Sequence, residues 1–343
     1  MGLQISEIIN KKQIQFSDLK GKTIAVDAFN AIYQFLTTIR QPDGTPLKDS
    51  SGNVTSHLSG LFYRNMNLIL EGVRLIYVFD GEPPELKAET WRIRKEAKDL
   101  AKRKYEEARA EEDIESMGKY ARSETHLDKQ KIKESKELLQ AMGIAVVQAP
   151  GEGEAQASYL AQQKEVYAVA SQDYDCLMFK AQKLIQNLSM SRKRKTISGY
   201  VEIFPQVIEL HEILKELEIN QEQLICVGIL CGTDYNPGGV KGIGQKKALQ
   251  VVKEYKTKEK IFGAIGNEEK YKKYSVDFDW EAIYDEIESP KIDKKAKIEF
   301  PKLDKEKIKK ILLKYEFSEE RIDNQLAKLE GGKKAKMQKT LFQ

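Results

Sequence analysis

The chain has 343 residues, 32% of them charged, yet its net charge at pH 7 is only +4 and its pI is near 8.6. No apolar run approaches the roughly 18 residues of a membrane helix, and no signal-peptide pattern is present, so a membrane protein is excluded and a globular α/β protein of one large or two smaller domains is expected. Three cysteines without C-x-x-C spacing, Cys176, Cys226 and Cys231, favour reduced, buried thiols in an intracellular protein over disulfides or zinc.

Residues 1–80 alternate as a βαβ unit does. We expect a helix near the N-terminus, a strand ending at Asp27 and a helix through Ala31 to Ile39. A polar loop over 41–55, another helix and a strand ending at Asp80 should follow.

Charge dominates the next segment. Nine basic and eight acidic residues between Lys87 and Asp113 leave no continuous apolar face, so this helix cannot lie in a core. Two interpretations remain: a solvated helix with i,i+4 ion pairs, or a mobile element beside an active site whose cationic face meets a polyanion.

The α/β alternation resumes near Ile132 with a helix that Gly143 should terminate. Strands are expected over 144–149, near 166–170 and near 183–187. The run 192–195 (RKRK) is expected to be a basic loop, either a nucleic-acid contact or a solvated turn, with a nuclear-localisation signal as a further alternative. From about 205 onward we expect mostly helix, and from Gly331 a disordered tail.

Acidic residues stand mostly where strand patterns stop. In an open α/β sheet, ligands bind outside the carboxyl ends of parallel strands, so acids at several such ends should share one pocket. Two pairs share i,i+2 spacing, the first on a Gly-rich turn that opens a helix and the second after a strand, so each pair can face one side. The full set is Asp27, Asp80, Glu152, Glu154, Asp173, Asp175 and Asp234.

Carboxylates without nearby His or Cys favour Mg²⁺ or Mn²⁺ over zinc. Seven are too many for one Mg²⁺, so two ions are expected, the arrangement used for in-line phosphodiester displacement. For any one acid alone, a helix cap or turn residue is the simpler interpretation, but the whole set favours the metal site.

The segment 239–247 (GVKGIGQKK) suits a helix-hairpin-helix element. Its glycines, Gly242 and Gly244 among them, let backbone N–H groups approach a phosphate, and the following helix adds its positive N-terminus. Lys246 and Lys247 contribute charge, so binding should follow the duplex backbone and weaken with salt. Gly-rich turns between helices are common, which is the alternative.

Together these motifs resemble those of the flap endonucleases, the structure-specific 5′ nucleases of DNA replication and repair, in their compact archaeal form. The resemblance runs from residue 1 to about 255 and rests on IAVDAFNAIYQF, TSHLSGLFYR, YVFDGEPP, APGEGEAQA, SQDYD, CGTDYN and GVKGIG, in that order. It implies a central, mostly parallel sheet flanked by helices (a PIN-like 5′ nuclease core), a helical arch and a C-terminal helix-hairpin-helix region. The implied activity is cleavage of a 5′ DNA flap with accompanying 5′–3′ exonuclease action.

The resemblance also implies residue roles. One Mg²⁺ would be held by Asp27, Asp80, Glu152 and Glu154 and a second by Asp173, Asp175 and Asp234, with Glu154 able to bridge. Lys87 and Arg94 would contact the scissile phosphate, and Tyr33 would stack on the neighbouring base, unless it is simply a core tyrosine. A K⁺ ion is expected at the 239–244 turn. The implied DNA contacts are Arg40, Arg64, Glu152, Gly232, Asp234, Gly242, Gly244, Lys246 and Lys247.

The implied regions overlap along the chain. They are an N-terminal nuclease region at 1–98, an arch at 87–130, an internal nuclease region at 116–258 with its DNA-binding motif near 239–249, a helical region at 259–330 and a flexible tail at 331–343.

The tail departs from the family pattern. A sliding-clamp (PCNA) contact is implied through Gln338, Leu341 and Phe342, but the aromatic pair of the motif would fall just past Gln343, so we expect clamp binding to be weak, altered or removed by truncation. A monomer in an archaeal cytoplasm, associated with the nucleoid, is expected, or a nuclear protein if the chain is eukaryotic.

Two other functions fit the sequence less well. A ribonuclease with a related acidic site would keep the metals but take RNA, and the helix-hairpin-helix pattern argues against it because backbone tracking needs a duplex. A catalytically silent junction-binding or clamp-associated scaffold is disfavoured by the complete acidic set.

Overall fold

The computed structural model describes residues 5–41, 44–110, 127–188, 193–196 and 199–329. Its centre is a seven-stranded sheet of order β1-β9-β6-β5-β2-β3-β4. The five strands from β6 to β4 are parallel, whereas β9 is antiparallel to both β6 and β1. This confirms the predicted α/β class. The strands are β1 (Lys12–Gln13), β2 (Thr23–Asp27), β3 (Arg74–Phe79), β4 (Ala145–Gln148), β5 (Ala168–Ala170), β6 (Lys183–Gln186) and β9 (Gln206–Glu209).

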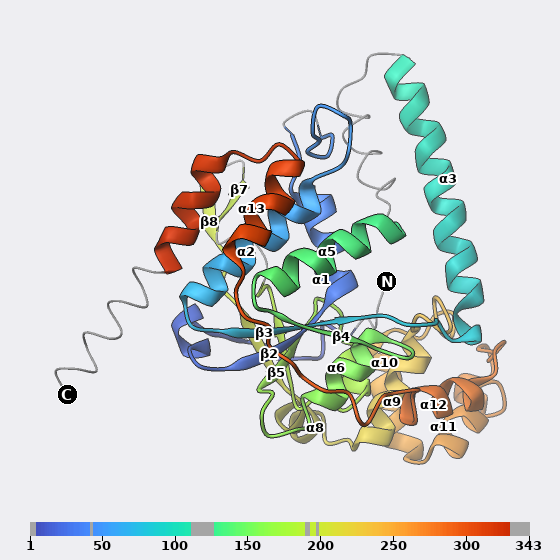
Figure 1. Ribbon diagram of the computed structural model, residues 1–343. Helices are drawn as coiled ribbons and strands as arrows, with labels where there is room; N and C mark the ends of the chain where they lie inside the picture. The colour runs from blue at the N-terminus through green and yellow to red at the C-terminus, as the bar shows by residue number, and fades with distance from the viewer. Residues whose placement is uncertain (1–4, 42–43, 111–126, 189–192, 197–198, 330–343) are drawn as a thin grey trace, which may run out of the picture.

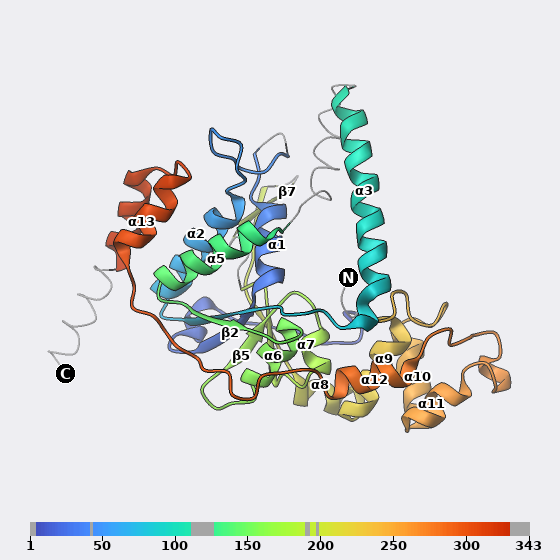
Figure 2. The same ribbon diagram turned by 45° about the vertical axis from the view of Figure 1, so that its right-hand side comes forward.

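The central strands are apolar on both sides because helices cover both faces of the sheet. Ile24 and Val26 of β2 belong to one core cluster and Ala25, between them, to the other. Helices α1 (Ala28–Thr38), α2 (Ser56–Leu70), α5 (Lys129–Ala141) and α13 (Lys305–Lys314) cover the first face (Figures 1 and 2). The second face carries α6 (Gly153–Leu160), α7 (Asp175–Met178), α8 (Leu210–Leu217), α9 (Gln221–Cys231), α10 (Gln245–Tyr255), α11 (Lys258–Ala264) and α12 (Trp280–Glu288).

The charged segment forms α3 (Ala88–Ala110), preceded by the 3-10 turn η2 (Glu85–Lys87). Figures 1 and 2 show α3 standing away from the sheet, with only its N-terminal end against the body of the molecule. The sequence therefore predicted correctly that this helix lies outside the core. Residues 111–126 of the expected arch lie outside the described residues.

Three local expectations were wrong. Residues 5–22 contain β1 and a 3-10 turn, η1 (Phe16–Leu19), in place of an α-helix, because this segment adds an edge strand to β9. Residues expected to form a basic loop include β7 (Lys193–Thr196), because this segment pairs with β8 (Gly199–Glu202) in a two-stranded antiparallel sheet. Helix begins only at Leu210, because the alternating segment 206–209 extends the sheet beside β6.

Three further features belong to the fold. Gly143, with φ of 77°, follows the last residues of α5 and ends it as predicted. Residues 290–303, between α12 and α13, run extended along the molecule (Figure 1) and exchange two hydrogen bonds with Gln156 of α6, at 2.7 and 3.0 Å. The short turn η3 (Glu269–Tyr271) precedes α12.

Candidate active site

The carboxyl ends of three adjacent parallel strands bring the predicted acids together. Asp27 ends β2, Asp80 follows β3, and Asp173 comes shortly after β5. Each influences the charge on its neighbours: Asp27 is repelled by Asp80 and Asp173. Glu154, in the first turn of α6, is repelled by Asp175, Asp27 and Asp173. The sequence-predicted clustering at this edge of the sheet is therefore present.

Burial makes this concentration of negative charge costly. It raises the pKa of Asp27 to about 8, and the carboxylates of Asp80 and Asp173 contribute in the same direction. Burial also raises the pKa of Asp80, and burial together with the neighbouring acids raises the pKa of Glu154 well above its ordinary value. The cluster therefore favours either protons or cations, a property typical of metal sites and catalytic sites.

Local hydrogen bonds fix the orientation of these acids. Asp27 caps α1 by accepting from the Asn30 backbone N–H at 3.1 Å, and the Asn30 side chain donates to Asp173 at 3.0 Å. The Ser171 hydroxyl donates to Glu154 at 2.9 Å. Sequence reasoning missed Asn30 and Ser171, since an isolated Asn or Ser beside a strand gives no signal of its own.

Asp80 is held from the other side by the first residue of α6. The Gly153 backbone N–H donates to Asp80 Oδ1 at 2.6 Å. A Cβ atom on residue 153 would lie 2.5 Å from that same oxygen, so glycine is required for the close approach. The G-E-G-E segment thus supplies two of the acids, Glu152 and Glu154, and its glycine at position 153 leaves room for Asp80.

The base of α3 lies directly against the acids. The Lys87 ammonium pairs with the Glu152 carboxylate and lies 3.7 Å from Asp234 Oδ2, while Arg94 Nη2 lies 2.7 Å from the same Asp234 oxygen. Lys87 is only 15% exposed and Arg94 is 44% exposed. Both cations predicted for the scissile phosphate therefore contact carboxylates of the cluster.

Two further residues join this contact. The Tyr235 hydroxyl donates to Glu152, and its ring centre lies 5.0 Å from the Lys87 ammonium. The buried Thr90 hydroxyl of α3 donates to the backbone carbonyl of Asp234. Neither was singled out from the sequence, although Tyr235 stands inside the CGTDYN motif. Their partners are far away in the chain, so no local pattern reveals them.

In the part of the chain that the structure describes, no group of three or more Asp, Glu, His or Cys side chains is arranged to hold a metal ion. Lys87, Arg94, Asn30 and Ser171 each contact a carboxylate oxygen of the cluster. The donor set nevertheless fits a hard divalent cation, because it is all oxygen and already accepts the Lys87 charge between Glu152 and Asp234.

The other predicted DNA contacts lie at separate places. Arg40 donates to the carbonyl oxygens of Leu36, at 3.1 Å, and Gly44, at 2.8 Å. Arg64, on α2, is partly buried, which lowers its pKa. Tyr33 is half-buried on α1, and Gly232 ends α9 with φ of 103°.

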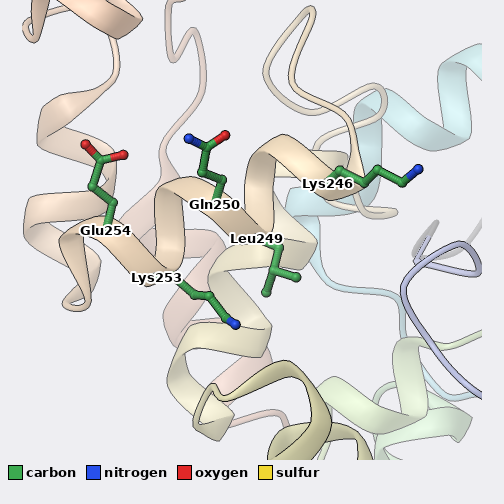
Figure 3. Close-up of a pocket in the computed structure, with 5 residues that line it drawn as sticks. All are labelled: Lys246, Leu249, Gln250, Lys253 and Glu254. Carbon is green, nitrogen blue, oxygen red and sulfur yellow. The ribbon is translucent and has the colours of Figure 1, made fainter.

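The predicted DNA-binding turn links α9 to α10, and these two helices pack together. Gly242 has φ of 84°, and Gly244 is the N-cap residue of α10. Lys247 donates to the Tyr274 hydroxyl at 2.6 Å, whereas Lys246 is exposed. Figure 3 shows Lys246 at the start of a shallow depression along α10 whose other lining residues are Leu249, Gln250, Lys253 and Glu254. None of the clustered carboxylates lines it.

The expected clamp contacts Gln338, Leu341 and Phe342 lie outside the described residues. None of the helices in the described part of the chain combines the length and apolar composition of a membrane span.

Two family models match the chain: the XPG N-terminal domain over residues 1–101 and the XPG I-region over residues 143–234. Flap endonuclease 1 of Thermococcus onnurineus is 48% identical over 344 residues, covering 99% of this chain and 98% of that protein. Flap endonuclease 1 of Pyrococcus furiosus is also 48% identical, with the same shares of both chains.

Solved structures agree with the sequence relatives. Flap endonuclease-1 from Methanococcus jannaschii is similar with a TM-score of 0.74 at 38% identity, covering 98% of this chain and 100% of that one. The catalytic core of Rad2 in complex with DNA substrate has a TM-score of 0.72 at 25% identity, covering 95% and 99%. Matches of this extent along the whole chain show that it belongs to the flap endonuclease 1 family of metal-dependent, XPG-type nucleases.

Proposed function

We propose that this chain is a structure-specific 5′-flap DNA endonuclease with 5′–3′ exonuclease activity, acting in Okazaki-fragment processing and long-patch base excision repair. The main observation behind the proposal is the cluster of buried carboxylates at the strand ends, in which burial and mutual repulsion raise the pKa values of Asp27 and Glu154. Lys87 and Arg94 form ion pairs with this cluster on one side. A cation-lined acidic site of this kind suits phosphodiester hydrolysis. The family relatives are named for the same flap activity.

The seven acids divide into two neighbourhoods that suit two Mg²⁺ ions, for which Mn²⁺ can substitute. Glu154 lies near Asp27, Asp173 and Asp175, whereas Glu152 and Asp234 share Lys87. Asp80, near Asp234 and Lys87, links the two. Bound divalent ions supply an activated water and stabilise the leaving oxygen. This grouping places Glu152 with Asp234, which differs from the division that the family resemblance implies.

Lys87 and Arg94 have two uses in this proposal. Without divalent ions they neutralise Glu152 and Asp234, which limits repulsion within the cluster. In the DNA complex both side chains would contact the scissile phosphate, where they would stabilise the charge that develops during cleavage. Tyr33, half-buried on α1, is proposed to stack on the neighbouring base.

Duplex DNA is proposed to bind along the α9–α10 turn. Gly242 and Gly244 expose backbone groups there, Lys246 extends into solvent, and K⁺ coordinated by backbone carbonyls would strengthen the phosphate contact. Arg40, Arg64 and Gly232 are proposed as further contacts. The related Rad2 core was solved with a DNA substrate, which supports DNA as the binding partner. A monomer with a weak PCNA contact through its tail, in an archaeal cytoplasm, completes the proposal.

The test is a flap substrate labelled at its 5′ end, incubated with Mg²⁺ or with EDTA, with product length read to the nucleotide. We expect one main product near the junction with Mg²⁺ and none with EDTA. Asp175→Asn and Asp234→Asn should each abolish cleavage while the fold persists in circular dichroism. Unchanged cleavage by either variant would refute the metal assignment.

The same assay separates the alternatives. Preference for single-stranded RNA over the DNA flap would identify a ribonuclease. Tight junction binding without product under any divalent ion would identify a scaffold.

A further inference from the structure

Trp91 is an apolar side chain that the fold leaves in solvent. It lies in the first turns of α3 and is 55% exposed, although its neighbour Thr90 is buried against the Asp234 loop. The other tryptophan of the chain, Trp280, is stacked on Phe262 with ring centroids 4.4 Å apart. A single exposed aromatic ring is common on protein surfaces, so the position of Trp91 and the charges around it decide whether it contacts a partner.

The position of Trp91 connects it to the catalytic region. It follows Lys87 by four residues and precedes Arg94 by three, so it lies beside the two cations that contact the acid cluster. A ligand on the Trp91 ring would therefore lie within one or two helical turns of the proposed cleavage site.

The charges around Trp91 favour a polyanion. Lys95 and Lys102, at i+4 and i+11, fall on the same side of α3 as Trp91, and both are exposed. Arg92, which points to a different side, is neutralised by Glu89 at 2.6 Å and Glu96 at 2.7 Å. One side of the helix thus combines the Trp91 ring with lysines, whereas the cation on the adjacent side, Arg92, is already paired with glutamates.

We propose that Trp91 is a stacking platform for a nucleobase of the single-stranded 5′ flap, with Lys95 and Lys102 following the flap backbone. This inference rests on the proposed flap activity. An aromatic face accepts any base, and the interleaved cations follow the phosphates, which is the usual chemistry of single-strand binding without sequence preference. Trp91 then orients the strand next to Lys87 and Arg94 and acts as a positioning residue.

The two tryptophans allow a direct optical test. In Trp280→Phe, emission reports Trp91 alone, and in Trp91→Phe it reports Trp280 alone. Each variant is titrated in EDTA with a flap substrate and with the same duplex lacking the flap. We expect the flap to quench the Trp91 signal and the flapless duplex to leave it nearly unchanged. An unaltered Trp91 signal at saturating flap would overturn the proposal.

Affinity provides the second readout. Trp91→Ala should weaken flap binding about 5- to 100-fold, Trp91→Phe should restore most of it, and the affinity for flapless duplex should stay unchanged. Arg92→Gln, a matched loss of one cation on the same helix, should bind the flap as wild type does. Equal weakening on both DNAs would contradict base stacking.

These results are distinguishable from failure of the flap activity itself. If wild-type protein does not cut flaps but its Trp91 emission responds to them, the nuclease proposal fails while the stacking surface stands. If cleavage occurs and the flap leaves the Trp91 emission unchanged, only the stacking proposal fails.

Discussion

Arg94 on α3 and Asp234 beyond α9 form an ion pair of 2.7 Å, although 140 residues separate them in the chain. Together with Lys87, this contact attaches the projecting helix to the acid cluster through the two cations proposed to act on the scissile phosphate. Any cation that enters the cluster must compete with this attachment. We therefore expect metal binding to influence the position of α3.

Replacing Lys87 or Arg94 by Gln should lower the single-turnover cleavage rate by about 100-fold, because each removes one charge from the developing transition state. Flap affinity should change much less. The measurement is rapid-quench cleavage at saturating enzyme. Arg92→Gln is the matched control, since Arg92 pairs only with exposed carboxylates on its own helix in the part of the chain described. An equal loss of binding would assign both cations a purely electrostatic steering role.

Tyr235→Phe removes the hydroxyl that donates to Glu152. Burial raises the pKa of Tyr235, so this hydroxyl stays protonated and remains a donor throughout the usual pH range. We expect metal affinity to fall by about 10-fold, as is usual when a partner of a metal ligand is lost. Isothermal titration with Mg²⁺ or Mn²⁺ measures this. Tyr315→Phe, remote from the cluster, should leave the affinity unchanged.

Metal-free protein should lose stability as pH rises from about 4 to about 8. The pKa of Asp27 is about 8 in the folded state and 3.8 ordinarily, so over this interval the folded state binds more protons than the unfolded state. Asp27→Asn keeps the helix cap but removes this titration. At pH 8 it should raise the free energy of unfolding by about 1–3 kcal/mol.

Thermal unfolding of both proteins in EDTA at pH 5 and pH 8 checks this expectation. The gain from Asp27→Asn should be small at pH 5, and Mg²⁺ should stabilise wild-type protein at pH 8 but the variant less. Identical pH profiles would show that Asp27 is not the group responsible.

A buried network on the opposite face joins α2, α5 and the end of α13. Glu134 accepts from the Tyr315 hydroxyl at 2.6 Å and lies 3.0 Å from His57 Nε2. Burial alone would raise the pKa of Glu134, but the hydrogen bonds from His57, Tyr315 and Gln130 outweigh it and lower the pKa.

Tyr315→Phe should therefore cost about 1–2 kcal/mol at pH 7. Because the folded-state pKa of Glu134 is depressed, the contribution of this network is complete above about pH 4.5 and declines as the pH falls further. Urea unfolding of both proteins at pH 7 and at about pH 2.5 measures the difference. A constant difference at both pH values would exclude ionised Glu134 as the acceptor.

Gly232→Ala should destabilise the protein by about 2–4 kcal/mol. Its φ is 103°, and a Cβ atom would lie 2.7 Å from the Gly239 nitrogen, in the loop that carries Asp234 and Tyr235. Gly244→Ala is the control, because its φ is −93° and a Cβ atom there meets open space. Thermal unfolding distinguishes a structural glycine from one needed only for DNA approach, which would alter binding but not stability.

Short-range patterns account for what was predictable in the fold. The apolar runs ending at Asp27 and Asp80 identify buried parallel strands because such strands carry apolar residues on both sides. The edge strand β1, its neighbour β9 and the hairpin strand β7 were missed, because they are short, partly polar and stabilised by pairing with a neighbour. Whether such a segment forms a strand depends on the neighbouring strand with which it pairs as much as on its own residues.

The sequence by itself determined that acids would gather at one edge of a parallel sheet and that α3 would lie outside the core. Both follow from local periodicity and from the direction of parallel strands. Only the tertiary structure decided which charges neutralise those acids, that Tyr235 holds Glu152 and that Asn30 holds Asp173. Such contacts join residues distant in the chain, and their energies depend on burial and on separations of a few ångströms, which exist only once the chain has folded.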